Sequence, residues 1–265
     1  MLKRRKKVTI LIPARLNSKR LPGKLLIEIQ GLPIIEHVRR RAELNKHKAE
    51  VYVVSNDEKI LKTVIENGGK TIRTYKKHLN GTSRCSEAAK LIKSDFFLIL
   101  QGDEILALPR HIDELISEAL IKPDIKIINL ISKLKNLSDL KNKNVVKCFL
   151  GKERQVIALF RKSPSTADPK LQMNLVFKVL GIFIFEASTL RNLSETKIQP
   201  LEKSELIEQL RIQEIGITLN TLQVDRSLES VNTESDLIKI KKYLIANREQ
   251  RLILNEIIEI GMNSN

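Results

Sequence analysis

The residues best suited to chemistry in this chain of 265 amino acids lie in one basic loop. The loop follows an apolar, β-branched run at 8–13 and contains Arg15, Ser18, Lys19, Arg20, Gly23 and Lys24. Fixed positive charges and backbone N–H groups in such a loop can wrap a polyphosphate. The sequence is not a Walker motif, and an ordinary solvated basic loop is the alternative interpretation.

A second candidate motif, Gln101-Gly-Asp-Glu104, follows a buried apolar run at 95–100. Asp103, at the carboxyl end of a strand and beside a phosphate-binding loop, is where Mg²⁺ would bridge to phosphate oxygens. Gly102 would let the backbone approach a ligand closely. An aspartate that only caps a turn is the alternative, so this motif alone leaves both interpretations open.

A third motif, Gly81-Thr-Ser-Arg84, lies where a predicted helix begins. Thr82 is expected to cap that helix. A cation such as Arg84 is disfavoured in a first helical turn, and an anionic ligand would offset this. Plain helix capping is the alternative. No Ser-His-Asp or Cys-His order is evident, and the histidines expected to be structural residues on helix surfaces are His37, His47 and His111.

The apolar pattern predicts the elements that position these motifs. Strands are expected at 8–13, 50–55, 70–74 and 95–100, alternating with helices at 33–44, 58–67, 82–93 and 109–120. This alternation predicts an α/β fold with a mostly parallel sheet and helices on both faces. Ligands of open parallel sheets bind beyond the carboxyl ends of the strands, where all three motifs lie.

The second half of the chain is less regular and predicts a small mixed β lobe. Strands expected at 124–132, 145–150, 155–161 and 178–185 have few helices between them. A helix at 204–214, a strand at 217–224 and a long helix from Thr233 onward complete the prediction. Thr233 and Asp236 also have the spacing of a helix capping box.

Composition and charge narrow the class of protein. The chain is 42% hydrophobic and 29% charged, which is ordinary for a folded domain. A formal net charge of +16 is compatible with a nucleic-acid-binding protein. However, aromatic residues make up only 4% and Trp is absent, so few side chains are available for bases to stack on. Small anionic substrates are therefore favoured over nucleic acid. The Arg39–Arg41 run is predicted to be the solvated face of a helix.

The sequence also indicates a compartment. No apolar stretch reaches the roughly 18 residues of a membrane-spanning helix, so no membrane insertion is expected. The basic start at 1–7 is followed by too short an apolar run for a signal peptide. Cys85 and Cys148 match no metal-binding spacing and are predicted to be free thiols in a reducing compartment. We therefore expect a cytoplasmic protein.

Taken in order, the motifs resemble those of the CMP-Kdo synthetase family, the 3-deoxy-manno-octulosonate cytidylyltransferases. The similarity runs from about Val8 to Leu244 and is carried by Pro13–Lys24, Gly81–Arg84, Gln101–Glu104, Pro200–Arg211 and Val231–Leu237. The first of these segments is shared with other sugar cytidylyltransferases. The Glu-Gln-Leu-Arg and Gln-Gly-Asp-Glu blocks are more specific.

This resemblance implies a Rossmann-like nucleotidyltransferase fold and a homodimer. It implies a Mg²⁺-dependent transfer of CMP from CTP to the anomeric hydroxyl of a 2-keto sugar acid (Kdo or Kdo-like), with release of pyrophosphate, for lipopolysaccharide or other cell-surface polysaccharide biosynthesis. The domain boundaries that follow are a basic tail at 1–7, a cytidylyltransferase domain at 8–248 with a dimerisation and sugar lobe at about 130–186, and a helical extension at 249–265.

The resemblance also implies roles for individual residues. The catalytic set is Arg15, Lys24 and Asp103. The nucleotide-binding set is Arg15, Ser18, Arg20, Lys24, Gly81, Thr82, Arg84 and Gln101. The sugar-binding pair is Lys162 and Gln209, and the metal-binding pair is Asp103 and Asn232.

Several positions depart from the family's pattern. Asn232 replaces a metal-binding aspartate, so the metal site is expected to be weakened without being lost. Lys162 replaces an arginine, which keeps the charge but loses bidentate geometry. Val179, Phe183 and Phe185 replace polar residues and are expected to face the sugar, unless they pack in the core behind it.

Two further functions therefore remain open on the sequence. One is CMP activation of a nonulosonic or other acidic sugar. The other is a catalytically weak, basic binding protein on the same fold, which the neutral Asn232 keeps open.

Overall fold

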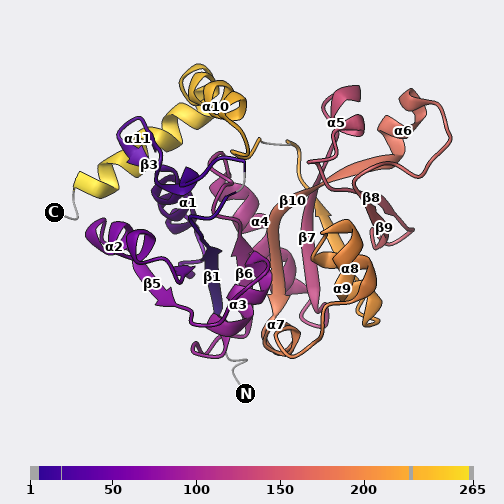
Figure 1. Cartoon of the computed structure of the whole chain (residues 1–265), viewed down its shortest axis with the longest axis horizontal. Helices are drawn as coiled ribbons and strands as arrows, with labels where there is room; N and C mark the ends of the chain where they lie inside the picture. The colour runs from indigo at the N-terminus through magenta and orange to yellow at the C-terminus, as the bar shows by residue number, and fades with distance from the viewer. Residues whose placement is uncertain (1–5, 19, 227–228, 263–265) are drawn as a thin grey trace.

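A nine-stranded mixed sheet forms the centre of the computed structural model, which describes residues 6–18, 20–226 and 229–262 (Figure 1). The order along its main path is β11 (Asn220–Gln223), β7 (Ile127–Lys133), β10 (Val176–Glu186), β6 (Phe96–Leu100), β1 (Val8–Pro13), β4 (Glu50–Ser55) and β5 (Lys70–Arg73). Strands β6, β1, β4 and β5 are parallel. The predicted α/β fold with a mostly parallel sheet is therefore confirmed.

Strand β10 runs antiparallel to its neighbours along the main path of the sheet. It pairs antiparallel with both β6 and β7, whereas β11 pairs parallel with β7. The apolar pattern predicted a strand here but not its direction. The amino-terminal part of β10 also pairs with β8 (Lys147–Leu150), so this one strand joins the main sheet to the smaller part of the molecule.

Helices cover both faces of the sheet and build a separate core on each. One core contains side chains of α1 (Ile34–Glu43), α2 (Glu58–Glu66), α4 (Pro109–Ile121) and α10 (Glu234–Ala246). The other contains side chains of α3 (Gly81–Ala89), α7 (Ala187–Leu193) and α9 (Gln209–Glu214). A short hairpin of β2 (Glu28–Ile29) and β3 (Leu32–Pro33) follows the 3₁₀ turn η1 (Lys24–Leu26).

The predicted small β lobe is present at one end of the molecule (Figure 1). It consists of the hairpin of β8 and β9 (Val156–Phe160) with two short helices, α5 (Leu137–Lys141) and α6 (Pro169–Leu175), which were not predicted. Hereafter "the lobe" means these four elements. It has its own small core of Leu134, Leu140, Phe160 and Val176.

Two predicted helices are each divided in two. The helix expected at 204–214 is α8 (Pro200–Glu205) followed by α9, because Leu206 between them adopts a left-handed conformation with φ 54°. The long C-terminal helix is α10 followed by α11 (Arg248–Met262). Asn247 between them is extended, and its side chain accepts the Gln250 backbone N–H at 3.0 Å.

The prediction that Arg39–Arg41 forms a solvated helix face is wrong. The exposed fractions of Arg39, Arg40 and Arg41 are 2%, 4% and 0%. Arg39 and Arg40 form ion pairs with Glu36, which is itself fully buried. Helix α11 packs on α1 and covers this face, which the charge pattern of α1 alone cannot reveal.

The predicted surface positions of two histidines are also wrong, because His37 and His111 are buried beneath other elements while His47 is half-buried. Cys85 and Cys148 are free, buried thiols, as predicted. Burial raises the pKa of the Cys148 thiol to about 12. None of the described helices is both long and apolar enough to cross a membrane.

Candidate active site

Three segments that are distant in the sequence meet beyond the carboxyl ends of β1 and β6. Lys24 Nζ donates to Asp103 Oδ2 at 2.6 Å and to the Val231 carbonyl at 2.7 Å. The Val231 N–H in turn donates to the Asp103 carbonyl at 3.2 Å. The basic loop and the acidic motif therefore lie together, as predicted, and the segment around Val231 forms a third wall of the site.

The basic loop owes its shape to a few backbone bonds. Gly23 adopts a left-handed conformation with φ 68°, which glycine accepts without steric cost. Its N–H donates to the Leu16 carbonyl at 3.0 Å, and the Leu16 N–H donates to Asp57 Oδ2 at 2.9 Å. Ser18 is half-buried within the loop, and Lys19 lies outside the described residues.

Two arginines of this loop are exposed, and their hydrogen-bond partners within the described residues are all neutral. Arg15 Nη1 donates to the Leu79 carbonyl at 3.3 Å. Arg20 donates through Nη1 to Asn144 Oδ1 and through Nη2 to Asn232 Oδ1, both at 2.7 Å. An anionic acceptor adds charge attraction and bidentate geometry that these neutral oxygens lack, so an anionic ligand can compete for both guanidinium groups.

The predicted metal ligands are Asp103 and Asn232. Carboxylate and amide oxygens suit Mg²⁺, which commonly takes one or two carboxylates together with substrate phosphates. The described residues contain no group of three His, Cys, Asp or Glu that could hold a metal alone. Asp236 is occupied, because it forms the predicted capping box with Thr233. The donor set therefore fits Mg²⁺ when a triphosphate supplies further ligands.

Gly81 brings the start of α3 against the strand ends. A Cβ at this position would lie 2.8 Å from Gln101 Oε1 and 2.9 Å from Pro13 Cγ, so only glycine allows this approach. Gln101 is fixed from two sides: its N–H donates to the Gly181 carbonyl at 2.9 Å, and Nε2 donates to Glu208 Oε1 at 3.2 Å. The prediction that these two motifs share one site agrees with this packing.

The remaining residues of α3 differ from expectation. The helix cap is Asn80, not Thr82, and its side chain accepts the backbone N–H three residues on at 2.8 Å. Thr82 instead donates its N–H to Glu208 at 3.3 Å. Arg84 is 6% exposed and donates to Thr74 Oγ1 at 2.6 Å, so it lies beneath the site.

Glu208 was missed by the sequence analysis, although it adjoins the predicted Gln209. It accepts bonds from Thr82 and Gln101, and burial raises the pKa of its carboxyl group. Its sequence separation from Gln101 is 107 residues, so no local pattern reveals the contact.

Glu104 is a second carboxyl group tuned by its surroundings. Its Oε1 accepts the Gly181 N–H at 3.2 Å. A Cβ at position 181 would lie 2.5 Å from the same oxygen, so glycine is required for this approach. Burial, followed by the nearby charge of Asp103, raises the pKa of Glu104 to about 7.

The two predicted sugar-binding residues lie in different environments. Gln209 is 7% exposed, and its Nε2 donates to Asn129 Oδ1 at 3.2 Å. Lys162 is exposed at the end of β9. The preceding Arg161 turns inward and donates to two carbonyls between α8 and α9, at 2.9 and 2.8 Å. The structure does not bring Lys162 and Gln209 into contact.

The expectation that Phe183 and Phe185 face a sugar is wrong, and the alternative of core packing is confirmed. Their exposed fractions are 1% and 0%, and their rings make a T-shaped contact at 5.7 Å. Strand β10 is antiparallel to β6, so Phe185 pairs with Phe97 and lies far from the carboxyl end of β6. Val179 is half-buried and packs against the same core.

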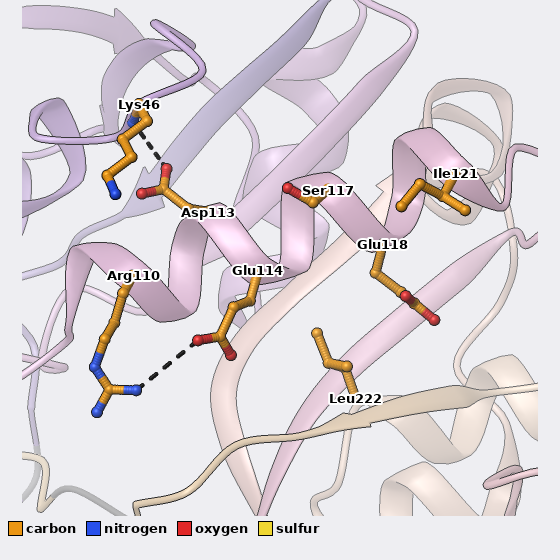
Figure 2. Close-up of a pocket in the computed structure, with 8 residues that line it drawn as sticks. All are labelled: Lys46, Arg110, Asp113, Glu114, Ser117, Glu118, Ile121 and Leu222. Carbon is orange, nitrogen blue, oxygen red and sulfur yellow. Dashed lines mark hydrogen bonds and ion pairs between the residues drawn. The ribbon is translucent and has the colours of Figure 1, made fainter.

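A hollow along α4 holds none of the predicted site residues. It measures about 490 Å³ and is lined by Lys46, Arg110, Asp113, Glu114, Ser117, Glu118, Ile121 and Leu222 (Figure 2). Arg110 is already paired with Asp225 and Glu249 at 2.9 Å each. Its guanidinium group is therefore already paired within the protein.

Open sheets of this kind bind their ligands beyond the carboxyl ends of the strands, which is where the basic loop and Asp103 lie. Residues 9–222 match the family model described as cytidylyltransferase, and the chain belongs to this family. A 3-deoxy-manno-octulosonate cytidylyltransferase of Geobacter metallireducens is 33% identical over 90% of this chain and 98% of its own length. One of Fusobacterium nucleatum is 35% identical over 89% and 96%.

Solved structures agree with this assignment. A CMP:2-keto-3-deoxy-manno-octonic acid synthetase complexed with CTP has a TM-score of 0.83 and 30% identity, covering 90% of this chain and 98% of its own. A cytidylyltransferase from Leptospira borgpetersenii has a TM-score of 0.65 at 20% identity, and this more distant likeness concerns the fold alone.

Proposed function

We propose that this cytidylyltransferase transfers CMP from CTP to the anomeric hydroxyl of 3-deoxy-manno-octulosonate or a closely similar 2-keto sugar acid, with release of pyrophosphate. The observation that carries the proposal is the meeting of Lys24, Asp103 and Val231, with Arg20 beside them on Asn232. This places two cations and one carboxylate around a single point at the strand ends. Relatives named 3-deoxy-manno-octulosonate cytidylyltransferase, which this chain matches over 96–98% of their length, support the substrate class.

The residues of this chain would act mainly by electrostatics. Negative charge develops on the phosphoryl oxygens during transfer, so cations aimed at them lower the barrier. Lys24, Arg20 and Arg15 supply those charges from one loop. Mg²⁺, which Asp103 and Asn232 would hold, would neutralise phosphate charge and help to orient the triphosphate.

The direct test is pyrophosphate release from CTP with a panel of 2-keto sugar acids. We expect CTP to be preferred over the other nucleoside triphosphates and divalent metal to be required. Lys24→Met should lose most of the rate, whereas Lys46→Met, an exposed lysine outside the site, should not. No pyrophosphate with any acid would favour the catalytically weak binding protein. Pyrophosphate release with a nonulosonic acid but not with Kdo would show that the substrate is a nonulosonic acid.

The candidate site does not indicate which substituents the sugar acid carries. Because Phe183 and Phe185 are buried, they cannot select an apolar group on the substrate. Near the lobe, the exposed Lys162 is the departure from the family's pattern that could still affect sugar binding. If Kdo is the substrate, the product feeds lipopolysaccharide biosynthesis.

A homodimer and a cytoplasmic location belong to the same proposal. Exposed leucines lie on α5, α6 and α8 and at the residue after α8, and are Leu137, Leu171, Leu175, Leu201 and Leu206. Exposed apolar side chains that gather into a patch are typical of protein interfaces. Sedimentation of the whole chain tests the dimer. Two free buried thiols are consistent with a reducing compartment.

A further inference from the structure

A single turn of the lobe, residues 142–145, is contacted by three cations from different parts of the chain. Arg20 donates to Asn144 Oδ1 at 2.7 Å. Arg161 Nη1 donates to the Lys143 carbonyl at 3.1 Å. Lys147 Nζ donates to the carbonyls of residues 142 and 145, at 2.8 and 2.7 Å. Arg20 comes from the basic loop, so this turn connects the proposed triphosphate site with the lobe.

Lys147 is the buried member of this group. Its exposed fraction is 0%, and within the described residues it forms no ion pair with a carboxylate. Burying an ammonium group is costly unless polar partners compensate. Here the compensation comes from the two carbonyls of the turn, which lie at its first and last residues. The lysine therefore ties both ends of the turn to β8.

The other contacts of the turn fix it further. The Val145 N–H donates to the Asn142 carbonyl at 3.2 Å, and the Asn144 N–H donates to Asn142 Oδ1 at 2.9 Å. Asn144 itself is exposed, so its side chain is free to meet Arg20 across the gap between loop and lobe. The position of Asn144 Oδ1 thus depends on how the turn is held.

We propose that Lys147 is a positioning residue for nucleotide binding: by clamping the turn, it holds Asn144 where it orients the Arg20 guanidinium toward the triphosphate. This inference rests on the proposed function, because it takes the basic loop to be the CTP site. An arginine side chain that must be immobilised on binding loses rotamer freedom, and pre-orientation removes part of that cost.

Asn144→Ala removes the side-chain contact with Arg20. Lys147→Met removes the bonds to the carbonyls of the turn and keeps the length of the side chain. The matched control is Lys143→Met, because this lysine lies in the same turn, has an exposed side chain and contributes only its carbonyl. We expect Asn144→Ala and Lys147→Met to weaken CTP binding roughly two- to twelvefold. Lys143→Met should bind CTP as tightly as the unchanged protein. The double variant Asn144→Ala/Lys147→Met should weaken CTP binding no more than the more damaging of the two single variants does.

Both variants are also measured in an Arg20→Met background, by kcat/KM for CTP. We expect their effect to disappear there, because the residue they orient is gone. A merely structural role would lower the unfolding temperature and persist without Arg20. Asn144 lies on an exposed turn, so its variant gives an answer even if Lys147→Met does not fold.

The outcomes separate the two proposals. If the unchanged protein neither binds CTP nor releases pyrophosphate, the proposed function has failed. If it does both and Asn144→Ala binds CTP equally well, the positioning role is wrong. A folded Lys147→Met variant with normal CTP affinity, or an effect that survives Arg20→Met, overturns it as well.

Discussion

Replacing Arg41 by methionine should stabilise the protein, although it removes a charge from helix α1. Arg41 is 0% exposed and donates from Nη1 to the Ala107 carbonyl at 3.2 Å. Its Nε and Nη2 atoms are buried and have no hydrogen-bond partner in the part of the chain that the structure describes. Burial lowers the pKa of this guanidinium group, which reflects the cost of holding the charge there.

The expected change in the free energy of unfolding follows from the number of buried polar groups that lose or lack a partner. Two unpaired buried donors cost about 1–3 kcal/mol each, and methionine removes both while filling a similar volume. The Ala107 carbonyl loses its donor, which costs about 1–3 kcal/mol in return. The expected net gain is about 1–3 kcal/mol, in line with replacements of buried charges by apolar residues. At about 2–4 °C per kcal/mol, the unfolding temperature should rise by several degrees.

Thermal unfolding followed by circular dichroism checks this, with Arg40→Met as the matched control one residue away. Arg40 is 4% exposed but pairs with Glu36 at 3.2 Å, and it donates to Asn67 Oδ1 at 2.8 Å and to the Ile257 carbonyl at 2.9 Å. Arg39 still pairs with Glu36 in this variant, but the Asn67 and Ile257 oxygens lose their donor. The variant should therefore destabilise the protein, by about 1–3 kcal/mol for each buried acceptor left unpaired. An unfolding temperature for Arg41→Met below that of the unchanged protein would refute the reasoning.

Four further outcomes are expected. Asp103→Asn should remove most of the pyrophosphate release, and full turnover would reject Asp103 as a metal ligand. Asn232→Asp should lower the Mg²⁺ concentration for half-maximal rate and raise KM for CTP; no change in either would place residue 232 away from the metal. Burial raises the pKa of Glu104 from an ordinary value near 4.5 to about 7. Between these pH values the folded protein holds a proton that the unfolded chain releases, so the free energy of unfolding should fall as the pH rises. Differential calorimetry should show a smaller fall for Glu104→Gln. Duplex DNA should bind only weakly, with a dissociation constant on the order of 10⁻⁴–10⁻⁶ M at physiological salt, and tight selective binding in a filter assay would contradict this.

The first half of the fold was predictable because its signals are local. Each buried strand there is a continuous apolar run, and each helix begins or ends at a recognisable residue, such as Pro109 or Gly68. Their bounds agree with the structure to within a few residues. The break at Leu206 has no such signal, because a leucine with φ 54° is imposed by its surroundings and not by its own preference.

In the candidate site, too, the features with local sequence signals were predictable and the long-range contacts were not. The basic loop and the Gln101–Glu104 motif are contiguous in sequence, and their chemistry could be inferred from residue type and position. Their partners could not, because Arg20 meets Asn144 across 124 residues and Lys24 meets Val231 across 207. The burial of Phe185 was equally hidden, since it depends on the antiparallel direction of β10.

The neutral residue at position 232 has two opposing consequences for the site. Its amide oxygen brings no charge to a metal ion, which weakens the metal site. The same oxygen holds Arg20 at 2.7 Å, and an amide releases a guanidinium group more readily than a carboxylate does. A carboxylate there would attract Mg²⁺ but would also compete with the triphosphate for Arg20. Under the proposed function, the site would keep Arg20 available to CTP and would rely on Asp103 for most of the protein's charge toward Mg²⁺. Asn232→Asp should therefore shift the Mg²⁺ and CTP requirements in opposite directions.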